Sequence, residues 1–313
     1  MPFFFYESQG EGFVGKRLKY SSLVLLGACC YGILSVIVKL AYKQGFTISE
    51  VIGSQYLFGF LFILVPFLFS KKSFSIKDAL YLAFAGTTTS LTSILYGKSL
   101  ETIPASIAVV LLFQFTWIGM IIEAIANRKM PSKEKLIAIT ILFIGTILAG
   151  GGSMNHLLTL DPIGIIFGLL SAISFAFFIF VSGRVAVHLP SITRSFLMTS
   201  GAFLFLIFVL SPNFIVNGSL GNGLWKYGSL LGLFGVLLPV LLFSIGTPKI
   251  GAGLATILGA AELPTAIIAS VVVLNESVST IQIFGVLLIL LGIAVPQLIH
   301  LKVRNAKRKE SIT

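Results

Sequence analysis

The stretch GAGLATILGAAELPTAIIASVVVLNE, residues 251–276, decides how the chain folds. It is apolar and long enough to cross a bilayer, yet Glu262 and Pro264 stand near its middle. An ionisable group at that depth is costly unless it faces a partner or a water-filled cavity. Proline removes one backbone N–H and displaces the carbonyl of Ala260, so we expect a polar helix break beside the carboxyl group. The rest of the chain is expected to enclose this site.

Composition places the chain in a membrane. Mean hydropathy is +1.02 and only 11% of residues are charged, against about 25% in soluble domains. Apolar runs of the length of a membrane-spanning helix occur ten times, so we predict an all-α integral membrane protein with ten transmembrane helices. The runs are 20–42, 50–70, 78–98, 103–125, 134–151, 162–183, 193–211, 226–246, 251–273 and 280–301.

The net charge is +11, and the basic residues are distributed as in a membrane protein rather than clustered as in a nucleic-acid site. If the N-terminal segment 1–19 is cytoplasmic, 18 of the 22 basic residues fall in cytoplasmic segments. The positive-inside rule then predicts that both termini are inside. The expected location is the plasma membrane, as a multi-pass protein. The basic tail 302–313 is interpreted as facing lipid headgroups, and no nucleic-acid partner is expected.

The chain also contains a weak internal repeat. An offset of about 147 residues sets 104–131 against 251–279, with a polar residue at mid-span in each. Gln114 and Trp117 then fall within one residue of the equivalents of Glu262 and Pro264. Since each half holds five spans, an odd number, the second half must enter the membrane from the opposite side. We therefore predict two inverted five-helix repeats, 20–151 and 162–301, with a site between them near the midplane.

These features resemble the EamA-type branch of the drug/metabolite transporter superfamily. The resemblance rests on Lys39 in ILSVIVKLAY, on Glu262-Leu263-Pro264, on Asn275-Glu276 in the following turn, and on ILLGIA in the last span. It covers about residues 20–300. It implies secondary-active movement of small metabolites, commonly amino acids and often outward.

Polar side chains at mid-depth predict a substrate pathway between the halves. Tyr31, Ser35 and Lys39 are spaced four apart and share one helix face, although Lys39 could instead snorkel to the headgroups. The hydroxyl-rich run 87–93 could line a wet path or bond its own backbone. The expected pathway residues are Tyr31, Ser35, Lys39, Thr88, Thr92, Gln114, Trp117 and Glu262.

Gln114 and Trp117 each allow two interpretations. A midplane glutamine must face inward because lipid offers it no hydrogen bonds, and its partner could be another helix or the substrate. Trp117 could stack on a ligand cation or ring, or simply pack.

Three roles for Glu262 are open. It could exchange a proton as the cavity opens to each side, with Gln114 or a hydroxyl bonding either protonation state. As an anion, it could hold the ammonium group of an amino acid or amine. A permanently protonated acid could instead brace the helix break at Pro264.

The expected function is secondary-active export by alternating access between the two repeats. The sequence has no GxxxxGK[ST] stretch, HExxH motif or cysteine pair at zinc spacing, so no ATP-driven pump, enzyme, metal or cofactor is expected. A flippase for lipid-linked sugars and a channel are the alternatives. Expected partners are a small-molecule substrate, the lipid bilayer and coupled protons. The stripe Gly164, Gly168, Ala172 and Ala176 indicates internal helix packing or, alternatively, a homodimer.

Overall fold

The computed structural model describes residues 4–70, 74–103, 105–149, 161–210, 212–275 and 278–310. These residues form helices joined by short turns, which confirms the predicted all-α membrane fold. Glu276 of the expected turn, residues 1–3 and residues 311–313 of the tail lie outside the described ranges. Seven helical stretches have the length and hydropathy of a membrane span: Arg17–Lys43, Ile48–Leu68, Val110–Asn127, Pro162–Ser182, Ser191–Val209, Leu220–Ile250 and Ala252–Leu274.

Together with the helices Ile76–Thr102 (α3), Lys133–Ala149 (α6) and Thr280–Glu310 (α13), these seven stretches form two sets of five helical segments in the same order. The first set is α1 (Phe4–Lys43), α2 (Ile48–Leu68), α3 (Ile76–Thr102), the interrupted span α4 (Ala105–Leu112) and α5 (Phe115–Asn127), and α6 (Lys133–Ala149). The second set is α7 (Pro162–Ser182), α8 (Ser191–Val209), the span α9 (Trp225–Gly232), η4 (Leu233–Leu237) and α10 (Leu238–Ile250), the interrupted span α11 (Ala252–Gly259) and α12 (Glu262–Leu274), and α13 (Thr280–Glu310). The short segments η2 (Asn213–Ile215) and η3 (Leu220–Leu224) lie between α8 and α9.

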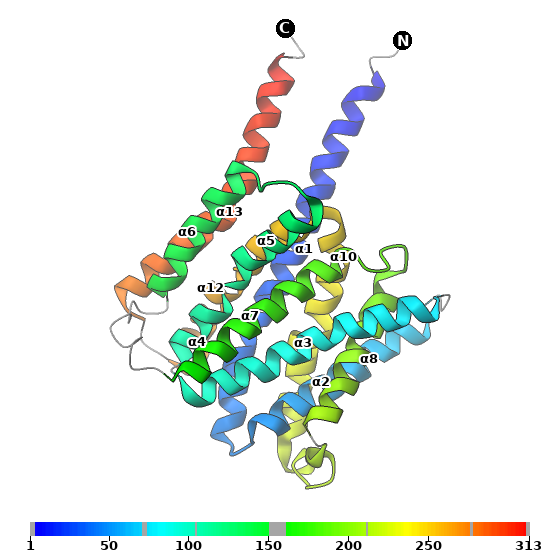
Figure 1. The fold of residues 1–313 in the computed structure, drawn as a ribbon, viewed down its shortest axis with the longest axis vertical. Helices are drawn as coiled ribbons and strands as arrows, with labels where there is room; N and C mark the ends of the chain where they lie inside the picture. The colour runs from blue at the N-terminus through cyan, green and yellow to red at the C-terminus, as the bar shows by residue number, and fades with distance from the viewer. Residues whose placement is uncertain are drawn as a thin grey trace.

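The first and last helices are longer than the expected spans. Helix α1 already begins at Phe4 and α13 continues to Glu310. A helix satisfies its own backbone hydrogen bonds, so it can continue from lipid into water without a break. Both projections leave the bundle at the same end (Figure 1).

The two sets pack against each other through equivalent helix pairs. Helix α1 packs on α10 and α12, and the counterparts of these pairs are α7 on α3 and α7 on α5. Helices α6 and α13, which are each other's counterparts, lie side by side along one edge of the bundle (Figure 1). Close approach depends on glycine: a Cβ built on Gly86 of α3 would lie 1.7 Å from the carbonyl oxygen of Met198 in α8.

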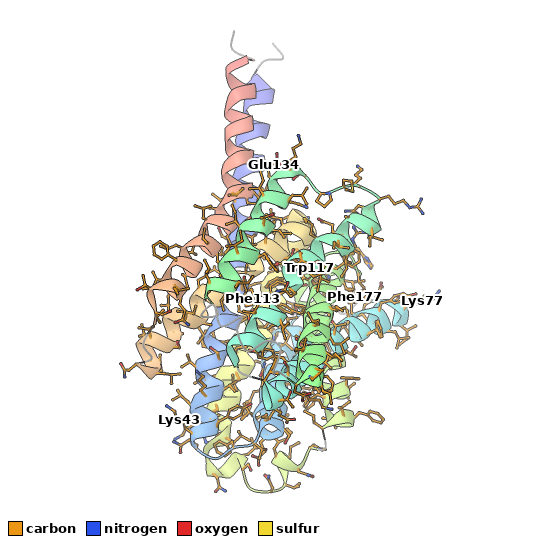
Figure 2. The ribbon with its side chains drawn as sticks, turned by 60° about the vertical axis from the view of Figure 1, so that its left-hand side comes forward. Lys43, Lys77, Phe113, Trp117, Glu134 and Phe177 are labelled. Carbon is orange, nitrogen blue, oxygen red and sulfur yellow. The ribbon has the colours of Figure 1, made fainter. Side chains whose placement is uncertain are left out.

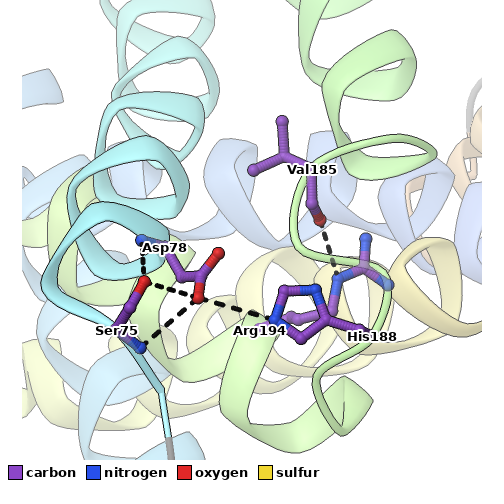
Figure 3. Close-up of polar contacts among 5 residues, drawn as sticks. All are labelled: Ser75, Asp78, Val185, His188 and Arg194. Carbon is purple, nitrogen blue, oxygen red and sulfur yellow. Dashed lines mark hydrogen bonds and ion pairs between the residues drawn. The ribbon is translucent and has the colours of Figure 1, made fainter.

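Carboxylates at two helix N-termini also join the halves, one at each end of the bundle. Glu50 forms a capping box with Thr47 at the start of α2 and accepts hydrogen bonds from Asn217 Nδ2 (2.7 Å) and Ser219 Oγ (2.5 Å). At the other end, Asp78 caps α3 with Ser75, and its Oδ2 lies 3.5 Å from Nε2 of His188 (Figure 3). We refer to these as the Glu50 end and the Asp78 end.

Arg194, counted in the sequence among the basic residues of the cytoplasmic segments, is 2% exposed. Its Nη1 donates to the Ser244 carbonyl (2.7 Å) and its Nε to the Val185 carbonyl (3.2 Å; Figure 3), while Nη2 donates to the Ser182 carbonyl. The guanidinium therefore joins the end of α7, the following turn and α10.

The substitution Arg194→Met is expected to destabilise the protein by roughly 3 kcal/mol, because three buried carbonyl groups lose their donor. The midpoint of thermal unfolding in detergent measures the loss. Lys77→Met, at an exposed position near the same end, is the control and should leave the midpoint unchanged. Equal midpoints for the two variants would contradict the bracing role of Arg194.

Candidate functional site

Two spans are interrupted at equivalent positions. Helix α4 ends at Leu112 and α5 begins at Phe115; α11 ends at Gly259 and α12 begins at Glu262. All of these bounds are related by the same offset of 147 residues, without any gap.

The equivalence extends to backbone bonding and to the dihedral angles at the breaks. Gln114 has φ −60° and ψ −15° and bonds the carbonyl three residues back, and Ala261 does the same with φ −64° and ψ −15°. Both C-terminal halves also end in a left-handed residue, Arg128 and Asn275. The backbone thus pairs Gln114 with Ala261, Phe115 with Glu262, and Trp117 with Pro264.

At the first break, Gln114 bonds within its own span. Its backbone N–H bonds Leu111 rather than Val110, and its side-chain Nε2 donates to the Val110 carbonyl (2.7 Å). Its Oε1 accepts the indole N–H of Trp117 at 2.6 Å. Phe113 and Trp117 lie at mid-height, between Glu134 toward one end and Lys43 toward the other (Figure 2). The glutamine therefore satisfies polar groups that the break exposes.

At the second break, a carboxyl group takes the place of a phenylalanine. Glu262 is half-buried in the first turn of α12, and no side-chain hydrogen bond or ion pair to it is made by the residues that the structure describes. Pro264 lies in the same turn, where a missing N–H costs no helical hydrogen bond. The Ala260 carbonyl, which we expected to be displaced, accepts from Leu263 N at 3.3 Å.

Two tyrosines flank this carboxyl group. A Cβ built on Gly32, the neighbour of Tyr31 in α1, would lie 2.4 Å from the carbonyl oxygen of Glu262, and Tyr96 of α3 lies within electrostatic range of the same residue. The Tyr31 ring also packs edge-on against Phe175 of α7, with centroids 5.5 Å apart, and lies 6.2 Å from the ring of Phe243. Tyr31 thus connects a carboxyl group on one side with an aromatic cluster on the other.

Residues 18–151 and 162–296 each match the EamA-like transporter family. The chain belongs to this family. A transporter of Synechocystis sp. (strain ATCC 27184 / PCC 6803 / Kazusa), named as uncharacterized, is 28% identical over 203 residues, which are 63% of this chain. This chain spans 60% of that relative's length. A solved crystal structure shares the fold, with a TM-score of 0.73 at 12% identity, over 90% of this chain and 96% of the other.

The hydroxyl-rich run of this EamA-like transporter bonds mainly to its own helix. Thr88 donates to the Ala85 carbonyl (2.6 Å) and Thr92 to the Thr88 carbonyl (2.7 Å). Ser35 donates to the Gly32 carbonyl (3.2 Å), and both Ser35 and Lys39 are exposed on α1. Tyr31 lies close to Glu262, and among the described residues no hydrogen bond links either of them to Thr88, Thr92 or Ser35.

Two tyrosines near the site were missed in the sequence as pathway residues. They are Tyr56 of α2 and Tyr96 of α3, neither of which is among the expected pathway residues. In the structure, Tyr56 is 3% exposed and its hydroxyl lies 3.1 Å from Ser93 Oγ. A tyrosine in the middle of a helix cannot be recognised from the sequence as a pathway residue unless the carboxyl group near it is known.

One cavity of the EamA-like transporter lies away from Glu262, toward the Glu50 end. It has a volume of about 270 Å³ and is bounded by the ends of α2, α3 and α8. None of the expected pathway residues lines it. Its lining residues are Thr47, Ile48, Ser49, Ile52, Ile94, Gly97, Lys98, Glu101 and Leu210.

Replacing Gln114 by leucine is expected to cost about 1–2 kcal/mol, because the Val110 carbonyl and the Trp117 indole N–H lose their partner. In a Trp225→Phe background, the emission of Trp117 should shift to shorter wavelength. Gln114→Glu keeps an oxygen acceptor for the indole and should preserve the emission while still lowering the unfolding midpoint. Identical spectra for all three proteins would contradict the hydrogen bond.

Proposed function

We propose that this EamA-like transporter is a secondary-active exporter of small metabolites such as amino acids, working by alternating access between its two halves. The observation that carries the proposal is the pair of equivalent helix breaks, only one of which bears a carboxyl group. Interrupted helices at the interface of inverted repeats are typical substrate and ion sites of secondary transporters.

Glu262 is the proposed coupling and binding group. Among the described residues, its carboxyl group has no hydrogen-bond or ion-pair partner. It is therefore available to bind a proton or the ammonium group of a substrate. Tyr31 and the buried aromatic rings of Phe175 and Phe243 form apolar surroundings beside it. This combination suits a small molecule with an amino group and an apolar body.

The proposed location is the plasma membrane, with both chain termini in the cytoplasm. The distribution of basic residues supports this orientation, as does the projection of helices α1 and α13 from the same end of the bundle (Figure 1). Reporter fusions after Gly152 and after Lys309 should report opposite compartments. A shared compartment would rule out five spans per half.

The proposal does not require a second subunit. The glycine stripe of α7 packs internally: Cβ atoms built on Gly164 and Gly168 would meet Thr102 and Leu111. A homodimer would have to use another face of the bundle.

Flux of soluble substrates tests the proposed function. Media from overexpressing and deleted cells are compared for metabolites, and candidates are then assayed in proteoliposomes with and without a pH gradient. Saturable flux that follows the proton gradient is expected. Changed envelope lipids without soluble flux would indicate a flippase, and flux that does not saturate would indicate a channel.

A further inference from the structure

Helices α5 and α11, one from each half, run side by side between the two helix breaks and the Asp78 end. Their contacts are spaced about one turn apart. A Cβ on Gly259 would lie 3.0 Å from the Phe115 ring, and one on Gly119 would lie 2.3 Å from Cγ2 of Thr256. The two helices are thus in close contact along the segment that leads from the breaks to this end.

At the Asp78 end, the contact between α5 and α11 is polar. A Cβ on Gly253 would lie 2.1 Å from Oε2 of Glu123, and the same oxygen accepts from Lys135 Nζ at 2.7 Å. The Glu123 carboxylate therefore lies against the start of α11, where the helix dipole favours a negative charge. Nearby, Arg184 of the second half donates a hydrogen bond to Asn127 at the end of α5.

The corresponding pair of helices in the other arrangement of the repeats is not in similarly close contact. The counterpart of α5 on α11 is α12 on α4, and among the described residues α12 and α4 make no comparable contact. In contrast, both members of the exchange pair α1 on α10 and α3 on α7 are closely packed. In a second state in which the two halves exchange conformations, α4 and α12 would be in contact and α5 and α11 would be apart. The α5–α11 contact is therefore one that changes between the two states.

We propose that the α5–α11 contact, made by Phe115–Gly259, Gly119–Thr256 and Glu123–Gly253, is the closed gate at the Asp78 end. Its counterpart between α4 and α12 is the gate that is open in this structure. The inference rests on the proposed transport cycle, in which each gate separates while the other closes. The α1–α10 and α3–α7 contacts persist in both states.

A disulfide across the gate tests this proposal. The Cβ of a cysteine at position 119 would lie 3.3 Å from Cβ of residue 256, close to the roughly 3.8 Å separation typical of disulfides. The double variant Gly119→Cys/Thr256→Cys is made with Cys29 and Cys30 replaced by alanine. The matched control is Gly27→Cys/Leu242→Cys across α1 and α10, where the Cβ separation is also 3.3 Å.

Two measurements on oxidised and reduced protein decide the outcome. Amide hydrogen exchange in 119–127 and 252–259 should slow at least about tenfold on oxidation of the gate pair and stay unchanged in the control. Flux in proteoliposomes should stop on oxidation and return with reductant. Exchange that is the same in both redox states, or flux that continues through the cross-linked protein, would overturn the proposal.

Hydrogen exchange needs no substrate, so it tests the gate even if transport of the chosen metabolites fails. Gly253→Ala provides a second variant that spares the backbone, because the added methyl group meets only the flexible side-chain ends of Glu123 and Lys135. It should speed exchange in 252–259 by about fivefold, the factor that corresponds to roughly 1 kcal/mol. Unchanged hydrogen exchange in this variant would show that the Glu123–Gly253 contact is not part of the gate.

Discussion

Proton-driven accumulation of substrate is expected to fall to the level of empty liposomes in the Glu262→Gln variant. Glutamine preserves the shape of the side chain and most of its hydrogen-bonding capacity but neither titrates nor carries charge. Accumulation against a pH gradient and counterflow exchange are measured on the same reconstituted protein. Glu101→Gln, at an exposed position on α3, is the matched control and should transport normally.

The pattern of loss separates the three roles of Glu262. Counterflow that survives when accumulation is lost would assign proton coupling to this carboxyl group. Loss of both activities would favour direct binding of the substrate ammonium group. Normal, pH-dependent accumulation in the variant would leave Glu262 as a brace of the helix break and would contradict the proposed coupling.

Gly86→Ala is expected to lower the unfolding midpoint more than any other substitution considered, with a cost of about 3 kcal/mol or more. The new Cβ would meet the Met198 backbone carbonyl at 1.7 Å, and a backbone group cannot turn aside as a side chain can. Helices α3 and α8 must then separate. Thermal unfolding and size-exclusion profiles in detergent measure the effect.

Gly97→Ala is the control on the same helix. Its Cβ would meet only Ile48 Cγ2 at 3.5 Å and Ile52 Cδ1 at 3.8 Å, which are ordinary contacts. The unfolding midpoint of this variant should remain near that of the parent. Similar midpoints for the two alanine variants would show that helix propensity, not close packing, determines the result.

Hydropathy and repeat counting were sufficient to predict the membrane fold, because lipid selects for long apolar helices whatever their detailed packing. The positions of the breaks were harder to find. Pro264 drew attention to the second break, but its equivalent in the first is Trp117, and the backbone is nearly the same at both. Proline therefore does not cause the interruption, and a search for proline finds only one of the two.

The sequence points to a functional side chain only where its residue type is rare in a membrane-spanning helix. Glu262 attracted attention because a carboxyl group is rare in lipid, whereas Phe175 is one of 28 phenylalanines and nothing in the sequence distinguishes it. The hydroxyls at Thr88 and Thr92 had two possible partners, their own backbone or water. The structure records the backbone hydrogen bonds.

Phe115 and Glu262 occupy the same backbone position in two copies of one scaffold. If the copies were identical, exchanging their conformations would give a second state of equal energy, related to the first by two-fold rotation, and the protein would have no preferred conformation. A phenyl ring and a carboxyl group respond differently to being enclosed or wetted. The two conformations therefore differ in energy, and in the proposed cycle a cation or proton bound at Glu262 shifts the balance between them.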